Sequence, residues 1–172
     1  SGKGGVGFIL EEHHGVSLPR DMLVEFSSMV QQLTEQLDRE VKSDEILDSL
    51  LKEYVVESGP YQLQDYDLLS GREDDQRCVA RVVVSEQVVT IDGEGSGPIE
   101  AFVNGLVETL NEPLNIVDYH EHALDTGKDA QAICLLAIDD EGGRCYGAGL
   151  SRNTITASLM AIISAMNRRW KA

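Results

Sequence analysis

Residues 76–111 read QRCVARVVVSEQVVTIDGEGSGPIEAFVNGLVETLN and contain the signals of two strands followed by a helix. Before the glycines, apolar residues alternate with polar ones, a period that is typical of a strand with one buried face. From Gly97 onward, apolar residues recur every three or four positions, which predicts an amphipathic helix over 97–111. The glycine-rich segment therefore marks the point where a strand turns into a helix.

This stretch has a second copy further along the chain. A shift of 56 residues places Cys78 on Cys134, Gly93 on Gly149 and Ala101 on Ala157, which indicates an internal repeat. The repeat predicts two tandem βββα units, about 60–112 and 113–172. Their expected elements are strands near 61–71, 76–85 and 87–92 with helix 97–111, then strands near 114–125, 130–139 and 143–149 with helix 153–169. One helix covers only part of a sheet, so we expect the units, and two chains, to pair.

The preceding part of the chain is helical in pattern and is predicted to form a small helical subdomain, 1–57, so that the fold class is α+β. The turn residues at 57–60 end this part and separate it from a second domain, 60–172. Ser17 is expected to cap a helix with Pro19 in its first turn, and Ser43-Asp44-Glu45 is expected to begin another. The apolar faces of these two helices are Met22, Leu23, Phe26, Met29, Val30, Leu33 and Leu37, then Ile46, Leu47, Leu50, Leu51 and Tyr54.

The first residues, SGKGGVGF, are similar to a nucleotide-binding phosphate loop. Such a loop needs a lysine and a serine or threonine at its end, where this chain has Phe8 and Ile9. Only Ser1 precedes Gly2, so the strand that presents such a loop is also not expected. We therefore predict a flexible entry segment that leads into a short amphipathic element, with apolar side chains from Val6, Phe8, Ile9 and Leu10.

The composition restricts the possible partners. Thirty acidic against fourteen basic residues give a net charge of -16, which repels phosphate backbones and anionic lipids. The longest apolar runs, such as ICLLAI at 133–138, are far shorter than a membrane span. We expect no nucleic acid and no membrane partner. The odd number of cysteines, Cys78, Cys134 and Cys145, excludes a full disulfide framework and favours a reducing compartment, the cytoplasm.

Gly93, Gly95 and Gly97 lie directly before a predicted helix start. Backbone N–H groups and the helix dipole at such a place favour an anion, and a carboxylate suits it. A tight turn without a ligand is the alternative explanation. The spacing G-x-G-x-G-P differs from the dinucleotide fingerprint G-x-G-x-x-G, and the surrounding unit is antiparallel in character, so a Rossmann site is disfavoured.

Chemistry that breaks bonds is not indicated. His120 and His122 lie on one face of a predicted strand, the geometry of a two-histidine metal site, but no third ligand is suggested. The serines lack a paired histidine and acid of recognisable spacing, and each cysteine is expected to fill the core. We predict no catalytic residue and no metal ligand in this chain.

Several blocks in order resemble the 2-isopropylmalate synthases of leucine biosynthesis. The blocks are SGKGGVGFIL at 1–10, SLPRDMLVEFSSMVQ at 17–31, DGEGSGPIEAFVNGL at 92–106, IVDYHEHALDTGKDAQAICLL at 116–136 and GAGLSRNTITASLMAIISAMNR at 147–168. The resemblance implies the helical subdomain and the C-terminal regulatory domain, which forms a homodimer and binds L-leucine as feedback inhibitor. The barrel that condenses acetyl-CoA with 3-methyl-2-oxobutanoate, and its divalent metal, are expected to lie outside this sequence. The fragment is therefore expected to be non-catalytic and to need no cofactor.

The resemblance also implies the residues of the leucine pocket. They are Gly95, Ser96, Gly97, Pro98, Ile99, Ile116, Tyr119, Ala123, Ala130 and Ala132. Two positions depart from the family pattern, since Ser96 stands where asparagine is frequent and Glu100 where some members have a small apolar residue. Three alternatives remain open: the isoleucine-sensing domain of citramalate synthase, a dimerisation module without a ligand, and, least favoured, an enzyme.

Overall fold

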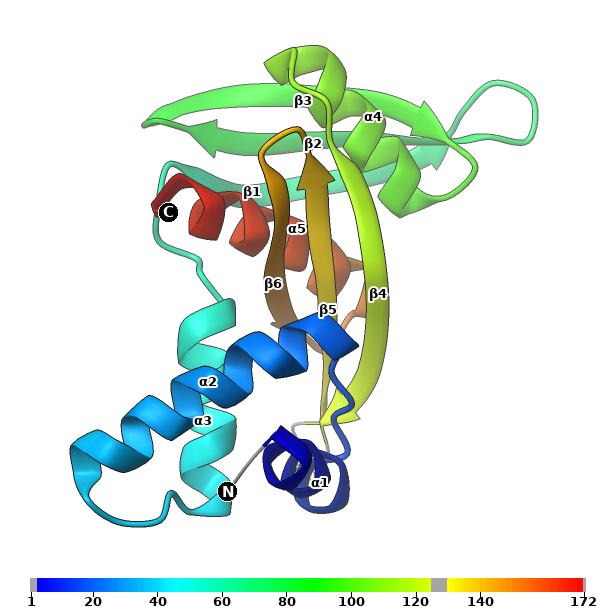
Figure 1. Cartoon of the computed structure of the whole chain (residues 1–172). Helices are drawn as coiled ribbons and strands as arrows, with labels where there is room; N and C mark the ends of the chain where they lie inside the picture. The colour runs from blue at the N-terminus through cyan, green and yellow to red at the C-terminus, as the bar shows by residue number, and fades with distance from the viewer. Residues whose placement is uncertain (1–2, 125–129, 172) are drawn as a thin grey trace.

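Figure 1 shows the computed structural model of the chain, which describes residues 3–124 and 130–171. Three helices come first, followed by two units of three strands and one helix, so the predicted α+β class and the two βββα units are confirmed. The elements in chain order are α1 Lys3–His14, α2 Arg20–Leu37, α3 Ser43–Tyr54, β1 Tyr61–Ser70, β2 Gln76–Val84, β3 Gln87–Gly95, α4 Pro98–Leu110, β4 Asn115–Leu124, β5 Gln131–Asp140, β6 Gly143–Ser151 and α5 Thr154–Lys171. The division between the domains 1–57 and 60–172 stays a prediction.

The two units form separate antiparallel sheets, β1-β2-β3 and β4-β5-β6. The strands of the first sheet run across one end of the second sheet (Figure 1). Helix α4 packs on β3 and β2, whereas α5 packs on β6 and β5 and also contacts β1. The core between the two units contains side chains from both sheets and both helices, including Cys78, Phe102, Leu136 and Ile162.

The internal repeat preserves a close approach between strand and helix. A Cβ atom on Gly93 would lie 2.2 Å from the carbonyl oxygen of Ala101, and one on Gly149 would lie 2.0 Å from that of Ala157. These are the pairs that the shift of 56 residues superposes. Glycine is thus required in both strands because the covering helix touches the strand backbone.

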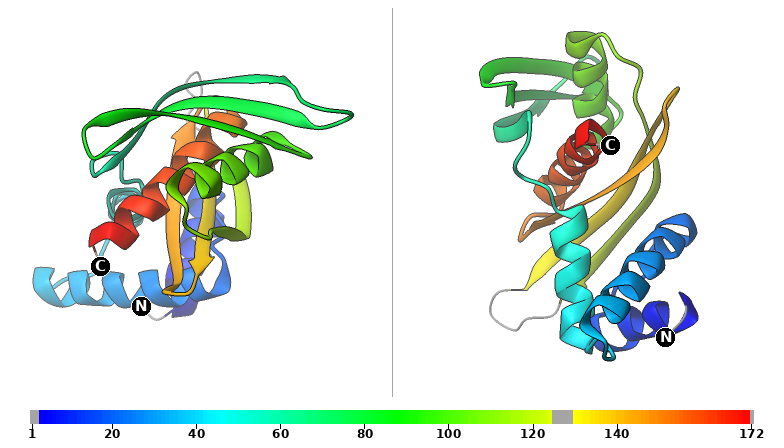
Figure 2. Two further views of the ribbon diagram at one scale, coloured as in Figure 1. Left: turned by 90° about the horizontal axis from the view of Figure 1, so that it is seen from above. Right: turned by 60° about the vertical axis from the view of Figure 1, so that its left-hand side comes forward.

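The second sheet is buried on both faces, whereas the first has one face in solvent. Ile133, Leu135 and Ala137 of β5 belong to a core shared with helices α1 to α3, and the alternate residues of β5 belong to the core between the units. Helices α1 to α3 and helix α5 accordingly lie on opposite sides of this sheet (Figure 2). A strand covered on both faces has a continuous apolar sequence, which explains the run ICLLAI.

The outer face of the first sheet carries ion pairs instead. Arg77 pairs with Asp92 across β2 and β3, with 2.6 Å between Nη2 and Oδ2. Arg81 pairs with Asp65 and Asp67 across β1 and β2. These side chains are substantially exposed, so this face is a solvent face.

The glycine-rich start of the chain is helical from Lys3 onward, which corrects the prediction of a flexible entry segment. Val6 and Leu10 are fully buried in the core with α2 and α3, and their burial stabilises the helix despite its glycines. Phe8, by contrast, is 61% exposed. The segment is therefore not a phosphate-binding loop; Ser1 and Gly2 lie outside the described residues.

The start of α2 also differs from the prediction. The helix begins at Arg20 with Pro19 as N-cap, and none of the described side chains caps it. Ser17 is not the cap because its backbone is engaged elsewhere. Its carbonyl oxygen lies 3.0 Å from His120 Nδ1 and 2.9 Å from His122 Nε2, so these two predicted neighbours attach the helical subdomain to β4.

Helix α3 begins at Ser43, as expected, but its N-cap is Lys42. The Glu45 carboxylate accepts a hydrogen bond from the Lys42 N–H at 3.0 Å and pairs with Arg39 at 2.8 Å. The Ser43 hydroxyl instead contacts the ring nitrogens of His13 and His14 at the end of α1. In residues 3–124 and 130–171, no helix is long and apolar enough to cross a membrane.

Candidate functional site

The predicted site residues 95–99 form the turn between β3 and α4. The ladder between β2 and β3 continues to the pair Gln76 and Gly95, so β3 is longer than its expected end at residue 92. Gly97 is the N-cap of α4 with φ -149°, and Pro98 follows in the first turn. Proline is tolerated there because its missing N–H would have no partner within the helix.

The glycines of this turn differ in the space that a side chain would find beside them. A Cβ atom on Gly95 would lie 2.8 Å from the Ala101 nitrogen, so Gly95, like Gly93, is needed for packing. A Cβ atom on Gly97 would meet nothing within 4 Å. Its φ lies in the extended region, which any residue adopts. Gly97 thus has open space beside it and no steric reason within this chain to be glycine.

A carboxylate of the chain itself already occupies part of this turn. Glu100 accepts a hydrogen bond from the Ser96 hydroxyl and one of 3.4 Å from the Ser96 N–H. Both residues are exposed. The N-terminus of a helix attracts negative charge, so the side chain of Glu100 lies where an external anion would be stabilised.

The second group of predicted site residues lies on β4 and at the start of β5. Ala123 is directly opposite Ala132 in the antiparallel ladder, and Ile116 is opposite Ile138. The register shifts between Val117 and His120, at a bulge where Asp118 has φ 56°. Tyr119 lies in this bulge and is 41% exposed. A bulge redirects a side chain, which here points the tyrosine toward α5.

Tyr119 forms two hydrogen bonds, each of 2.8 Å, with the Glu121 carboxylate and the Ser158 hydroxyl. Burial and the neighbouring Glu121 raise the pKa of Tyr119 far above its usual value. The phenol therefore keeps its proton at neutral pH and remains a hydrogen-bond donor.

Three of the ten predicted site residues border the same core. Ile99, Ile116 and Ala132 all pack against the core between the two units. Gly97, Ala123, Ala130 and Tyr119 are open to solvent to different extents. Ser96 is hydrogen-bonded to Glu100, and Tyr119 to Glu121 and Ser158, so these bonds do not link the turn at 95–99 to β4. The convergence of all ten residues on one ligand stays a prediction.

Sequence reasoning missed two polar partners of this site. Ser158 is 1% exposed and lies on the first turns of α5, and Glu121 alternates with the histidines along β4. A polar residue within the apolar stripe of a helix is the signal that could have identified Ser158. Glu121 carries no such signal, since an acid beside histidines on an exposed strand is common.

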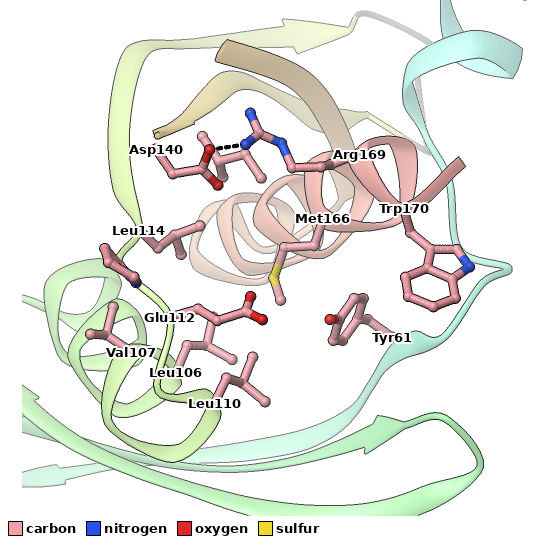
Figure 3. A pocket seen from close by; sticks show the side chains of 12 residues that line it. Tyr61, Leu106, Val107, Leu110, Glu112, Leu114, Asp140, Met166, Arg169 and Trp170 are labelled. Atoms are coloured by element: carbon pink, nitrogen blue, oxygen red, sulfur yellow. Dashed lines mark hydrogen bonds and ion pairs between the residues drawn. The ribbon is translucent and has the colours of Figure 1, made fainter. Parts of the chain in front are cut away.

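A pocket of about 280 Å³ opens at the C-terminal ends of α4 and α5 (Figure 3). Apolar side chains from both helices, including Leu106, Leu110 and Met166, form its floor, and the ion pair between Asp140 and Arg169 closes one side. None of the ten predicted site residues lines it. The sequence analysis did not predict this pocket, because its walls come from segments that are up to 109 residues apart, Tyr61 and Trp170.

Two observations concern metal binding and thiol reactivity in the described residues. Within 3–124 and 130–171, no group of three histidine, cysteine or acidic residues could hold a metal ion. Cys78 and Cys134 are fully buried in the core, and burial raises the pKa of each thiol to about 11. A thiol of that kind stays protonated and is a weak nucleophile at neutral pH.

The arrangement as a whole defines a tandem βββα module that shares a core with a helical subdomain. The profile of the LeuA allosteric (dimerisation) domain family matches residues 40–170, and the chain belongs to this family. The chain is 36% identical over 171 residues to a 2-isopropylmalate synthase of Brucella suis biovar 1 (strain 1330), a match that covers 98% of the chain. It is 37% identical over 170 residues to one of Corynebacterium efficiens (strain DSM 44549 / YS-314 / AJ 12310 / JCM 11189 / NBRC 100395), again over 98% of the chain.

A third relative, the 2-isopropylmalate synthase of Cupriavidus taiwanensis (strain DSM 17343 / BCRC 17206 / CCUG 44338 / CIP 107171 / LMG 19424 / R1), is 35% identical over 175 residues and covers the whole chain. The chain spans 31% of the Brucella relative, 30% of the Cupriavidus relative and 29% of the Corynebacterium relative. The likeness therefore concerns one part of much longer proteins.

Proposed function

We propose that this chain is the regulatory part of a cytoplasmic 2-isopropylmalate synthase and binds L-leucine as feedback inhibitor. In this proposal, two copies form a homodimer, and the condensation of acetyl-CoA with 3-methyl-2-oxobutanoate takes place in a metal-dependent barrel outside this sequence. The family match and the three relatives support the parent enzyme. The binding of leucine is argued from the residues of the candidate site.

The observation that carries the effector proposal is the open space beside Gly97. The strand–helix packing explains Gly93 and Gly95, but nothing within 4 Å of the Gly97 Cβ position explains the third glycine. A backbone without a side chain at a helix N-terminus lets a carboxylate approach the amides closely. A glycine needed only for a sharp turn would be expected to have a positive φ, and Gly97 has φ -149°.

The other groups suit the remaining parts of a free amino acid. In this proposal, Glu100 leaves the Ser96 N–H to the ligand carboxylate, and the carboxylates of Glu100 and Glu121 accept hydrogen bonds from the ammonium group instead. Ile99, Ile116 and Ala132 are partly buried and apolar, and they can contact a branched tail. A zwitterion with an aliphatic side chain thus matches the chemistry of the site in each of its three parts.

Calorimetric titration of the chain with leucine, isoleucine and valine tests the proposal. We expect heat with leucine and weaker binding of the other two, and valine, which lacks one methylene, should lose about 1–3 kcal/mol. A preference for isoleucine would instead support the domain of a citramalate synthase. No binding of any of the three would leave a dimerisation module without a ligand.

A further inference from the structure

We infer that helix α5 couples the proposed effector site to the helical subdomain, and that Arg168 is the residue through which this coupling passes. The identity of the ligand rests on the proposed function, whereas the mechanical link between the two ends of the helix is a property of this chain. Allosteric coupling requires an element that both sites contact and whose position both can bias.

The N-terminal end of α5 holds one tyrosine from each sheet. The Thr156 hydroxyl lies 2.6 Å from the hydroxyl of Tyr66 on β1, and the Ser158 hydroxyl lies 2.8 Å from that of Tyr119 on β4. Ser158 also donates to the Thr154 carbonyl at 2.9 Å. The first turns of this helix are therefore fixed by contacts with both units and with a predicted site residue.

The hydrogen bonds around Tyr119 have two arrangements because each hydroxyl has only one proton. In the first, Ser158 donates to Tyr119, which donates to the Glu121 carboxylate. In the second, Tyr119 donates to Ser158, which donates to the Thr154 carbonyl. An ammonium group that binds Glu121 would lower the proton affinity of this carboxylate, weaken its hydrogen bond from Tyr119 and so favour the second arrangement. Ligand occupancy is thus communicated to a buried side chain of α5.

The middle of α5 cannot move independently of the sheet below it. A Cβ atom on Gly147 would lie 2.3 Å from the Ala165 nitrogen, and one on Gly149 would lie 2.6 Å from the Ala161 nitrogen. The strand backbone therefore touches the helix backbone at two successive turns. Such close packing transmits a displacement rather than absorbing it.

The C-terminal end of α5 contacts two helices of the helical subdomain. The Arg168 guanidinium donates to Glu53 of α3 at 2.9 Å and lies 3.4 Å from the Glu25 carboxylate of α2. Its side chain is only 13% exposed, and it also donates to the Tyr146 carbonyl at 2.7 Å. Because the two carboxylates belong to different helices, a shift of Arg168 changes how α2 and α3 are held together.

Two neighbours of Arg168 fix the connection between the domains. Ser164 accepts a hydrogen bond from the Val56 N–H at 2.9 Å. The fully buried Asn167 donates to the carbonyls of Val56 and Tyr61 and accepts from the Tyr61 N–H at 3.0 Å. The end of α5 thus holds both the linker and the helices that the linker joins. Ser158 and Arg168 are ten residues apart, about 15 Å along a helix.

Hydrogen–deuterium exchange of the amides in α2 and α3 tests the inference on the full 172-residue chain. In the wild type, we expect leucine to change these exchange rates at least about fivefold, the lower end of typical allosteric coupling. In Arg168→Met, we expect this change to be lost while leucine still binds with measurable heat, its affinity altered only by the lost coupling. Persistence of the full α2 and α3 response in Arg168→Met would overturn the inference.

Arg39→Met is the control, because Arg39 makes a bidentate ion pair with Glu45 inside the helical subdomain. This variant should keep the response to leucine. If Arg168→Met does not fold, Arg168→Lys replaces it, since lysine keeps the charge but lacks the planar fork that reaches two carboxylates. A wild-type response in Arg168→Lys would then count against the coupling.

A second arm needs no ligand and separates the inference from the proposed function. Ser158→Ala removes the contact with Tyr119 and should change exchange in α3 of the wild type but not of Arg168→Met. Absence of heat on titration would refute leucine binding and leave this arm to decide the coupling. An α3 response to Ser158→Ala that is the same in both backgrounds, or absent from both, would refute the coupling itself.

Discussion

The guanidinium carbon of Arg168 lies 4.3 Å from the centre of the Tyr54 ring, at the place where the last helix meets the third. Tyr54 is fully buried and donates a hydrogen bond of 2.6 Å to Glu25. Burial and the Glu25 carboxylate raise the pKa of Tyr54, so that its phenol remains a donor at every physiological pH. The pair joins α5 to α3 by a cation–π contact, and both residues bind the Glu25 carboxylate of α2.

Tyr54→Phe should therefore destabilise the chain by about 1–2 kcal/mol, because it removes the hydrogen bond to a charged group but keeps the ring beneath the guanidinium. Tyr54→Leu should cost more, since it also removes the cation–π contact. Urea denaturation of the two variants measures both effects. A Tyr54→Phe variant as stable as the wild type would show that the hydroxyl contributes nothing net.

Alanine substitutions of the two repeated glycines, Gly93 and Gly149, should destabilise the chain to a similar extent. Gly93→Ala and Gly149→Ala each place a methyl group against a helix backbone, and we expect each to cost about 3 kcal/mol or more. Gly97→Ala, which has open space, should stay within about 1 kcal/mol of the wild type. Thermal unfolding of the three variants compares them directly, and a large loss in Gly97→Ala would contradict the role given to that space.

Gly97→Asp should abolish leucine binding without harming the fold. Aspartate is a favourable N-cap, and the open space accepts its side chain, so stability should be retained. Its charge repels the carboxylate of the ligand, and we expect at least a tenfold loss of affinity, about 1.4 kcal/mol. Gly97→Asn, of similar size but uncharged, is the control. Equal binding by the two variants would exclude the electrostatic explanation.

The ion pair between Arg39 and Glu45 should contribute stability that depends on pH. Hydrogen bonds from Arg39 and from the Lys42 backbone lower the pKa of Glu45 from 4.5 to about 2. Because the folded pKa is depressed, the contribution is fully present above pH 4.5 and is lost as the pH falls through about 2. The difference in unfolding midpoint between wild type and Glu45→Gln should therefore shrink across this window. A constant difference would rule out the pair as its source.

Local sequence signals were sufficient for most of the elements. Alternation of apolar residues located β2, the glycines located the turn into α4, and the repeat extended both predictions to β5 and α5. The cap of α2 was predicted wrongly because the backbone of Ser17 is held by His120 and His122, more than 100 residues away. Periodicity carries no information on such a pairing.

The site was harder to predict than the fold. The packing role of Gly93 was not predicted, since the glycines were interpreted as an anion site or a tight turn. The engagement of Ser96 by Glu100 and of Tyr119 by Ser158 likewise depends on side-chain positions that spacing does not determine. The resemblance supplied the ten candidate residues, and the geometry added the partners that surround them. A contact such as that between Tyr119 and Ser158 depends on how β4 packs against α5, which the local sequence pattern does not determine.

The two units no longer have interchangeable roles, although one is a copy of the other. The first sheet presents charged pairs to water, whereas the corresponding face of the second sheet packs in a shared apolar core with α1 to α3. A shortened chain that began at residue 60 would lack α1 to α3. It would expose the side chains of Ile133, Leu135 and Tyr146 to water and would be prone to aggregate. Of the two units, only the first has an outer sheet face that is suited to water; the second depends on α1 to α3 to cover that face.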